Sequence, residues 1–77
     1  MNDDDKMATA SYLSNLADSA MVYERKGPVF KSVAASMWAA FQGAQSLAVY
    51  LGFPEDEALR IKEDAKTKPT LAEMMEG

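Results

Sequence analysis

The longest uncharged stretch of the chain, residues 32–53, constrains the fold more than any other feature. It reads SVAASMWAAFQGAQSLAVYLGF and contains neither a charged residue nor a proline over 22 positions. A run of this length is long enough to cross a bilayer as a helix. Gln42 and Gln45 interrupt it near its middle, however, and alanine and serine supply much of the rest, which leaves too little apolar character for a membrane span. The stretch therefore predicts a helix that is covered by protein rather than by lipid.

Two corners that contain glycine and proline divide the chain around this central helix. Gly27 and Pro28 end a first amphipathic helix, which we expect to begin at Met7. The central helix then begins at Pro28 and ends at Gly52, and Pro54 begins a third helix. The predicted fold class is all-α: a long antiparallel helical hairpin, a third helix packed across its end through a helix-turn-helix-like corner, and a short C-terminal helical tail.

The composition indicates a single small domain, residues 1–77, that performs no catalysis. The chain has 77 residues, so its core is small. It contains no cysteine and no histidine, which excludes disulfides, thiolate or imidazole metal sites, and catalysis that depends on either side chain. The net charge of −4 opposes binding to anionic membranes and nucleic acids. We therefore expect no enzymatic activity, no cofactor and no metal, and a cytoplasmic location because no signal peptide is recognisable.

The two ends of the chain are expected to lie outside the helical core. Residues 1–6, MNDDDK, are either a native acidic lead-in to the first helix or the remnant of an expression tag. At the other end, Thr70 and Glu73 match a capping box, which predicts one or two frayed turns between Leu71 and Glu76. We expect residues 67–77 to form a tail that is mobile until a partner orders it.

Both sides of the central helix lack charge. The expected core face consists of Phe30, Val33, Ala34, Met37, Phe41, Ala44, Ala48 and Leu51. The opposite side, here called the small-residue face, consists of Ser32, Ala35, Ser36, Ala39, Gly43 and Ser46. A helix surface exposed to water normally carries charged side chains, so we expect this face to be covered. The first and third helices of the same chain, a second copy in a homodimer, or a different protein could cover it.

A second predicted surface is centred on Trp38, which a helical wheel places at the edge of the core face near Val49. A tryptophan at this position belongs either to the core or to an interface, because the centres of interfaces are enriched in tryptophan. The third helix would add Glu55, Asp56 and Leu59 to the same surface. We predict that these residues bind a protein partner through a basic or apolar groove on that partner.

Residues 44–64 also have the spacing of a helix-turn-helix, with Ala48 before the corner and Gly52 within it. The start of the third helix would then enter the major groove of DNA, but Glu55 and Asp56 would repel its phosphates. Nucleic-acid binding would require the cations of this region to share one face with the third helix. These cations are Arg25, Lys26, Lys31, Arg60 and Lys62. We therefore do not expect nucleic-acid binding.

The most consistent function is that of a non-enzymatic interaction module, a small regulator or inhibitor that binds a larger protein and blocks it sterically. Such a small, acidic chain resembles, in type only, the regulators encoded by phages and mobile elements, including anti-defence proteins. Two alternatives stay open: a DNA-binding transcriptional regulator that uses residues 44–64, and a structural subunit of an assembly.

Overall fold

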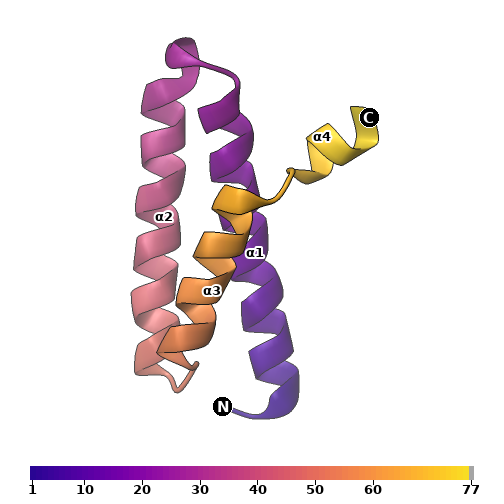
Figure 1. Cartoon of the computed structure of the whole chain (residues 1–77). Coiled ribbons are helices and arrows are strands. Elements are labelled where there is room, and N and C mark those ends of the chain that lie inside the picture. The colour runs from indigo at the N-terminus through magenta and orange to yellow at the C-terminus, as the bar shows by residue number, and fades with distance from the viewer. Residues whose placement is uncertain (77) are drawn as a thin grey trace.

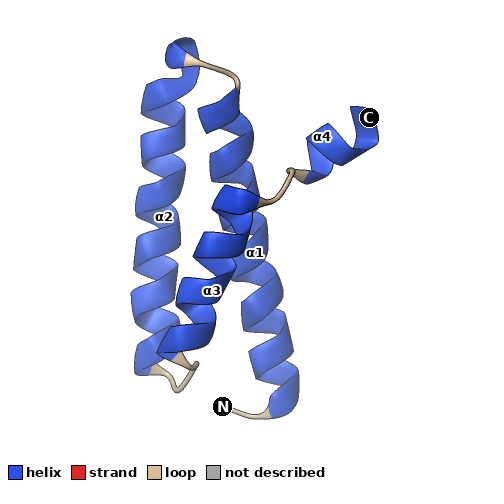
Figure 2. Ribbon diagram, viewed as in Figure 1, coloured by secondary structure: helices blue, strands red, loops and turns tan. Residues whose placement is uncertain are grey.

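The computed structural model describes residues 1–76, which fold into helices joined by short turns (Figures 1 and 2). The elements in order are α1 (Asp3–Arg25), the 3-10 turn η1 (Pro28–Phe30), α2 (Lys31–Tyr50), α3 (Glu55–Thr67) and α4 (Leu71–Glu76). Within the described residues there is no strand, so the predicted all-α class is confirmed.

The helices α1 and α2 form the expected antiparallel hairpin (Figure 1). The third helix, α3, begins at the open end of the hairpin and runs back toward the turn, packing mainly on α1. It therefore covers more of the hairpin than its end alone. The short helix α4 projects to one side. No helix in residues 1–76 combines the length and the apolar character needed to cross a bilayer.

The first helix begins at Asp3, four residues before the expected start at Met7. Asn2 caps it, because the Oδ1 atom of Asn2 accepts a hydrogen bond of 2.8 Å from the backbone N–H of Asp5. Three aspartates in the first turn, Asp3 to Asp5, add favourable charge at the positive end of the helix dipole. Most of the segment 1–6 is therefore helical rather than an irregular lead-in.

The first corner places Gly27 at φ 109° and ψ −174°, a conformation that only glycine adopts readily. Pro28 does not begin an α-helix, as the sequence suggested, but a single 3-10 turn. This turn is closed by the N–H of Phe30, which donates to the carbonyl of Gly27 at 3.1 Å. The α-helical geometry of α2 starts at Lys31.

The second corner is a Schellman cap, and the predicted end of the central helix at Gly52 is confirmed. Gly52 has φ 109° and donates from its N–H to the carbonyl of Val49 at 3.0 Å. The N–H of Phe53 donates to the carbonyl of Ala48 at 2.9 Å, and both side chains are buried in the same cluster. Pro54 then occupies the N-cap position, and α3 begins at Glu55.

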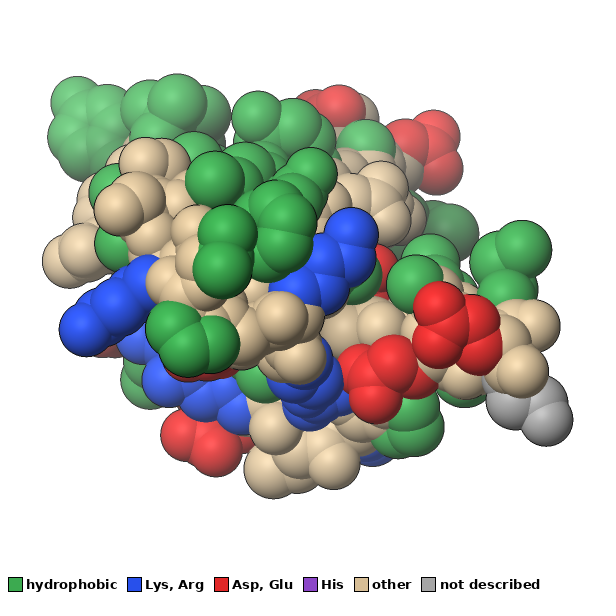
Figure 3. All heavy atoms as spheres, turned by 90° about the horizontal axis from the view of Figure 1, so that it is seen from above, with side chains coloured by type: hydrophobic (Ala, Val, Ile, Leu, Met, Phe, Trp, Pro, Cys, Tyr) green, Lys and Arg blue, Asp and Glu red, His purple; other side chains and the backbone are tan. Residues whose placement is uncertain are grey.

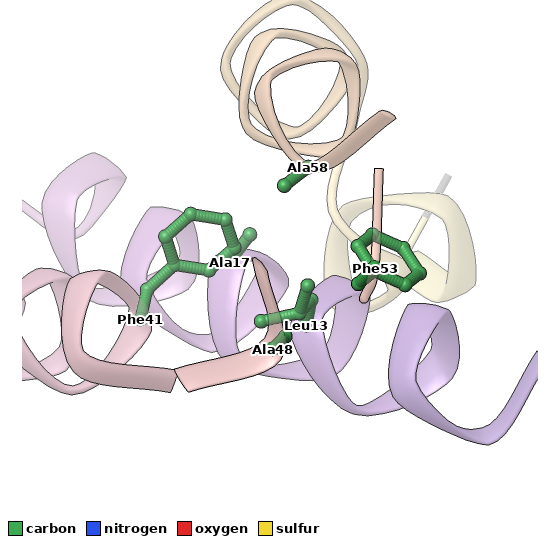
Figure 4. Close-up of a cluster of buried hydrophobic side chains, with 6 residues drawn as sticks. All are labelled: Leu13, Ala17, Phe41, Ala48, Phe53 and Ala58. Carbon is green, nitrogen blue, oxygen red and sulfur yellow. The ribbon is translucent and has the colours of Figure 1, made fainter. Parts of the chain in front are cut away.

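A compact cluster of buried side chains holds the three main helices and the second corner together (Figure 4). It consists of Leu13, Ala17, Phe41, Ala48, Phe53 and Ala58. Alanines at the contacts let the helix backbones approach, while two phenylalanines and one leucine supply most of the buried apolar area. Burial of each of these large side chains contributes about 1.5–3 kcal/mol.

The expected core face of α2 is correct at its centre and wrong at one edge. Ala34, Phe41 and Ala48 are buried, but Val33 and Leu51 are 41% and 56% exposed. Helical spacing places both exposed residues on the side of α2 that lies away from α3. Since no other part of the described chain packs there, these side chains stay in contact with water.

Candidate protein-binding surfaces

The small-residue face of α2 is open to solvent in the single chain. All of its residues are exposed: Ser32, Ala35, Ser36, Ala39, Gly43 and Ser46. A methyl group added at Gly43 would have no neighbouring atom within 4 Å. The arrangement in which α1 and α3 cover this face is therefore wrong. Pairing of two copies through it stays a prediction.

Four of the five residues predicted to bind a partner lie along the seam between α2 and α3. Val49 and Glu55 line one hollow of about 350 Å³ together with Gln42, Gln45 and Ser46. Leu59 follows Glu55 by one helical turn and is 49% exposed. We call this seam the α2–α3 groove and define it by Trp38, Gln42, Gln45, Val49, Glu55 and Leu59.

Asp56 does not belong to the α2–α3 groove. It is exposed, and it follows Glu55 by one residue, which turns its side chain by about 100° around α3. Of the predicted residues, Val49 and Glu55 therefore line one hollow, and Asp56 points elsewhere on α3.

Trp38 is both a core residue and a surface residue. Its ring meets the ring of Phe41 edge-on, with centroids 5.6 Å apart and planes at 81°. From the outer side, the ammonium groups of Lys62 and Lys66 lie 5.8 Å and 5.4 Å from the centre of the indole ring. Each such contact at an exposed site contributes about 0.5–1 kcal/mol. The indole is therefore held in a defined orientation.

The surroundings of Trp38 are basic, although the sequence placed the acidic start of α3 on the same surface. A hollow of about 540 Å³ beside the indole is lined by Lys31, Glu24, Gly27, Pro28, Ala34 and Ala35. Lys31, Lys62 and Lys66 thus lie at this end of the groove, and Glu55 lies at the other end. Figure 3, a view onto the turn of the hairpin, shows Lys and Arg side chains spread from the left edge of this end to just right of its centre.

Arg25 is a structural residue that the sequence did not reveal. Its guanidinium donates to Glu73 Oε1 at 2.6 Å and to the carbonyl oxygens of Ala65 and Lys66 at 3.4 Å and 3.1 Å. It therefore fastens both the end of α3 and α4 to α1. The hydrogen bonds from Arg25 and from the N–H of Thr70 hold the pKa of Glu73 below its ordinary value.

The C-terminal tail is tied to the hairpin at its start. The predicted capping box is confirmed: the N–H of Glu73 donates to Thr70 Oγ1, and the N–H of Thr70 donates to Glu73 Oε1, both at 3.2 Å. The N–H of Leu71 donates to Asp18 Oδ1 at 3.1 Å. The mobility expected of residues 67–77 stays a prediction, and Gly77 lies outside the described residues.

The cations that DNA binding would require do not share one face. Arg25 is occupied by Glu73, and Lys26 lies over the rings of Tyr23 and Phe30 at 5.4 Å and 5.5 Å. Helical spacing places Arg60 about 160° around α3 from Lys62. Of the required set, Lys31 and Lys62 both lie near Trp38, at one end of the groove.

A further apolar surface lies on the side of the hairpin opposite α3. A hollow of about 300 Å³ between α1 and α2 is lined only by residues of these two helices and their ends: Met1, Ala8, Thr9, Tyr12, Leu13, Ala44, Leu47, Ala48 and Leu51. Tyr12, Leu47 and Leu51 are 59%, 60% and 56% exposed. We call this surface the back face and define it by Ala8, Thr9, Tyr12, Ala44, Leu47 and Leu51.

The sequence did carry a signal for the back face. Alternating steps of four and three residues, the repeat of a helix-packing seam, connect Val33, Met37, Ala40, Ala44, Leu47 and Leu51. Four residues of this seam, Val33, Met37, Ala44 and Leu51, were assigned to the core face because the seam and the core face lie side by side on α2.

A comparison of the chain with protein-family models, with curated proteins and with solved structures finds no match.

Proposed function

We propose that this chain is a non-enzymatic interaction module that works as a homodimer, and that it regulates or inhibits a larger protein by binding it through the α2–α3 groove. The observation that carries the proposal is the composition of this groove. Trp38, Val49 and Leu59 offer partly exposed apolar surface, with lysines at one end and Glu55 at the other.

The state of Trp38 supports a binding role. Interface hot spots are enriched in tryptophan that lies in a well-packed setting and loses its remaining water on binding. The contacts with Phe41 and the two lysines already fix the indole, so little side-chain entropy would be lost when a partner binds.

The charges of the groove define the kind of segment that fits it. A complementary segment would place acidic side chains at Lys62 and Lys66, apolar side chains over Trp38 and Leu59, and a basic or polar side chain at Glu55. The sequence-based expectation of a purely basic or apolar target groove is therefore replaced by a target surface with both signs of charge.

The two alternative functions have less support. A DNA-binding regulator that uses residues 44–64 would bring Glu55 and Asp56, both exposed, against phosphates. A structural subunit would assemble beyond a dimer without any separate target.

The experiment begins with the capture of a partner from cells of the source organism, and purified partner is then titrated with the chain by calorimetry. Replacement Leu59→Ala should weaken the affinity by about 5- to 30-fold, as expected for a hot spot of 1–2 kcal/mol. Leu71→Ala is the matched control, because Leu71 is 57% exposed but lies on α4. Equal affinities of the two variants would contradict the proposal.

A further inference from the structure

The back face consists of uncharged residues, yet it is exposed in the single chain. On α2 it follows the heptad-like seam from Val33 to Leu51. On α1 a matching line, again with alternating steps of four and three, contains Asp5, Thr9, Tyr12, Leu16, Ser19 and Tyr23. The hairpin thus carries two such seams side by side, one on each helix. A surface of this kind is suited to pack against two further helices.

Charge is found on this surface only at its two ends. At the open end of the hairpin, Asp5 lines a hollow with Met1, Ala8, Thr9 and Leu51. At the turn, Lys26 lies over the rings of Tyr23 and Phe30. Asp5 and Lys26 are about 31 Å apart along α1 at 1.5 Å per residue. The surface is therefore acidic at one end, basic at the other and apolar between them.

We propose that a second copy of this chain covers the back face in an antiparallel orientation, forming a four-helix dimer. A two-fold axis across the hairpin, near Leu16, would place α1 on α1 and α2 on α2 of the second copy. Asp5 of each chain then lies near Lys26 of the other, at both ends of the interface. A parallel arrangement would instead gather both Asp5 at one end of the dimer and both Lys26 at the other, with no opposite charges facing each other.

The sequence along both seams fits this two-fold arrangement. Residues equally distant from the axis face each other, so the tyrosines of α1 meet smaller side chains and the alanines at the middle of the α2 seam meet each other. The facing pairs along the seams are Tyr12 with Ser19, Val33 with Leu51, Met37 with Leu47, and Ala40 with Ala44, and Tyr23 faces Ala8 beside the α1 seam. Alternation of large and small residues is what lets facing helix layers interdigitate.

The available area is adequate for a stable dimer. The molecule is 38 Å long, and two packed helices are about 20 Å wide including their side chains. The whole side of the hairpin opposite α3, of which the back face is a part, therefore has a projected footprint of about 760 Å² on each chain, comparable with the roughly 800 Å² per partner of a standard protein interface.

This inference rests on the proposed function, which includes a homodimer, and it specifies the surface and the orientation through which the two copies pair. It also relocates the interface from the small-residue face to the adjacent side of α2. In the antiparallel dimer both α2–α3 grooves lie on the outside, because α3 covers the opposite side of each hairpin (Figure 1). Target binding and self-association would then occupy different surfaces.

The first test is light scattering on the full chain and on two variants of similar exposure. The unaltered chain should have twice its monomer mass of 8.4 kDa. Leu47→Glu, on the back face, should return the mass to 8.4 kDa, whereas Ala39→Glu, on the small-residue face, should leave the dimer intact. A monomeric unaltered chain, or a dimer that only Ala39→Glu dissociates, would overturn the proposal.

Folding and orientation are controlled separately. Far-ultraviolet circular dichroism should show the same helix content in all variants, and Tyr12→Glu serves as a second back-face variant should Leu47→Glu unfold. For orientation, Asp5→Lys and Lys26→Asp should each weaken the dimer by about 2- to 10-fold, the range of exposed ion pairs. The double variant should recover the original affinity. If the two single variants and the double variant all dimerise with the affinity of the unaltered chain, the antiparallel orientation is overturned.

The outcomes also separate this inference from the proposed function. A strictly monomeric chain that still binds its target with a Leu59-dependent affinity would remove the pairing and leave the regulator in place. If the chain dimerises and its variants behave as expected, but no target protein binds it, the results would support the pairing and not the proposed regulatory function.

Discussion

Replacement of Phe53 by alanine is the sharpest test of how the second corner holds the fold together. Phe53 is 2% exposed and packs in the same cluster as Leu13, Phe41 and Ala58, so it connects α3 to the hairpin (Figure 4). Loss of a buried phenylalanine costs about 3–5 kcal/mol, because apolar burial is lost and a cavity is left behind. A chain of this length has a total stability of about 4–12 kcal/mol. We therefore expect Phe53→Ala to remove between a quarter and all of the stability.

The assay is urea denaturation followed by circular dichroism at one fixed protein concentration, because self-association would make stability depend on concentration. Tyr50→Ala is the matched control: Tyr50 is an aromatic residue near the same corner but 86% exposed, and its loss should cost about 0.5 kcal/mol or less. A cost for Phe53→Ala within 1 kcal/mol of the control value would refute the view that this side chain anchors α3.

The remaining predictions concern the glycines and the tail. Gly52→Ala should destabilise the chain by about 1–2 kcal/mol because of its φ of 109°, whereas Gly43→Ala, in open space within α2, should stabilise it by about 0.5–1 kcal/mol; urea midpoints in the reverse order would contradict the geometry. Arg25→Gln should lower the unfolding free energy by no more than about 1 kcal/mol but should speed tryptic cleavage after Lys66, and unchanged cleavage would contradict the role of Arg25. Because the pKa of Glu73 is lowered from 4.5, the stabilisation that its carboxylate contributes is complete above pH 4.5 and is lost as the pH falls through the lowered pKa. Hydrogen exchange at the amides of α4 should therefore accelerate in acid. The variant Glu73→Gln should abolish this dependence on pH.

Local chemistry explains why much of this fold could be predicted from the sequence. The Gly52–Phe53 corner and the Thr70–Glu73 capping box are specified within a few residues, since the caps are closed by hydrogen bonds to near neighbours. The start of α1 was misplaced because Asn2 was regarded as part of an acidic run and not as a cap.

The side of the hairpin that α3 covers could not be predicted in the same way. On α2, the buried line through Ala34, Phe41 and Ala48 and the exposed seam from Val33 to Leu51 are one residue apart in the sequence. Both have helical periodicity and apolar character, so only the direction of the chain after Phe53 decides which of them is buried. This is why Val33 and Leu51 were assigned to the core.

Four of the five residues predicted for the candidate site lie along the α2–α3 groove, but the positive charges of Lys62 and Lys66 beside Trp38 were not predicted. Trp38, Val49, Glu55 and Leu59 come from helices that the corner brings together, and helical spacing was sufficient to group them. The lysines at Trp38 were missed because their position depends on where the far end of α3 lies. That position is fixed by Arg25, which is far from Lys66 in the sequence.

The most direct test of the account is a set of amide NMR spectra recorded over a dilution series of the unaltered chain. The central claim is that two separate surfaces work by contact, the back face with a second copy and the α2–α3 groove with a target. On dilution, the signals of Tyr12, Leu47 and Leu51 should shift, while those of Val49 and Leu59 should stay constant. Shifts confined to the groove or to the small-residue face, or none at all, would contradict the claim.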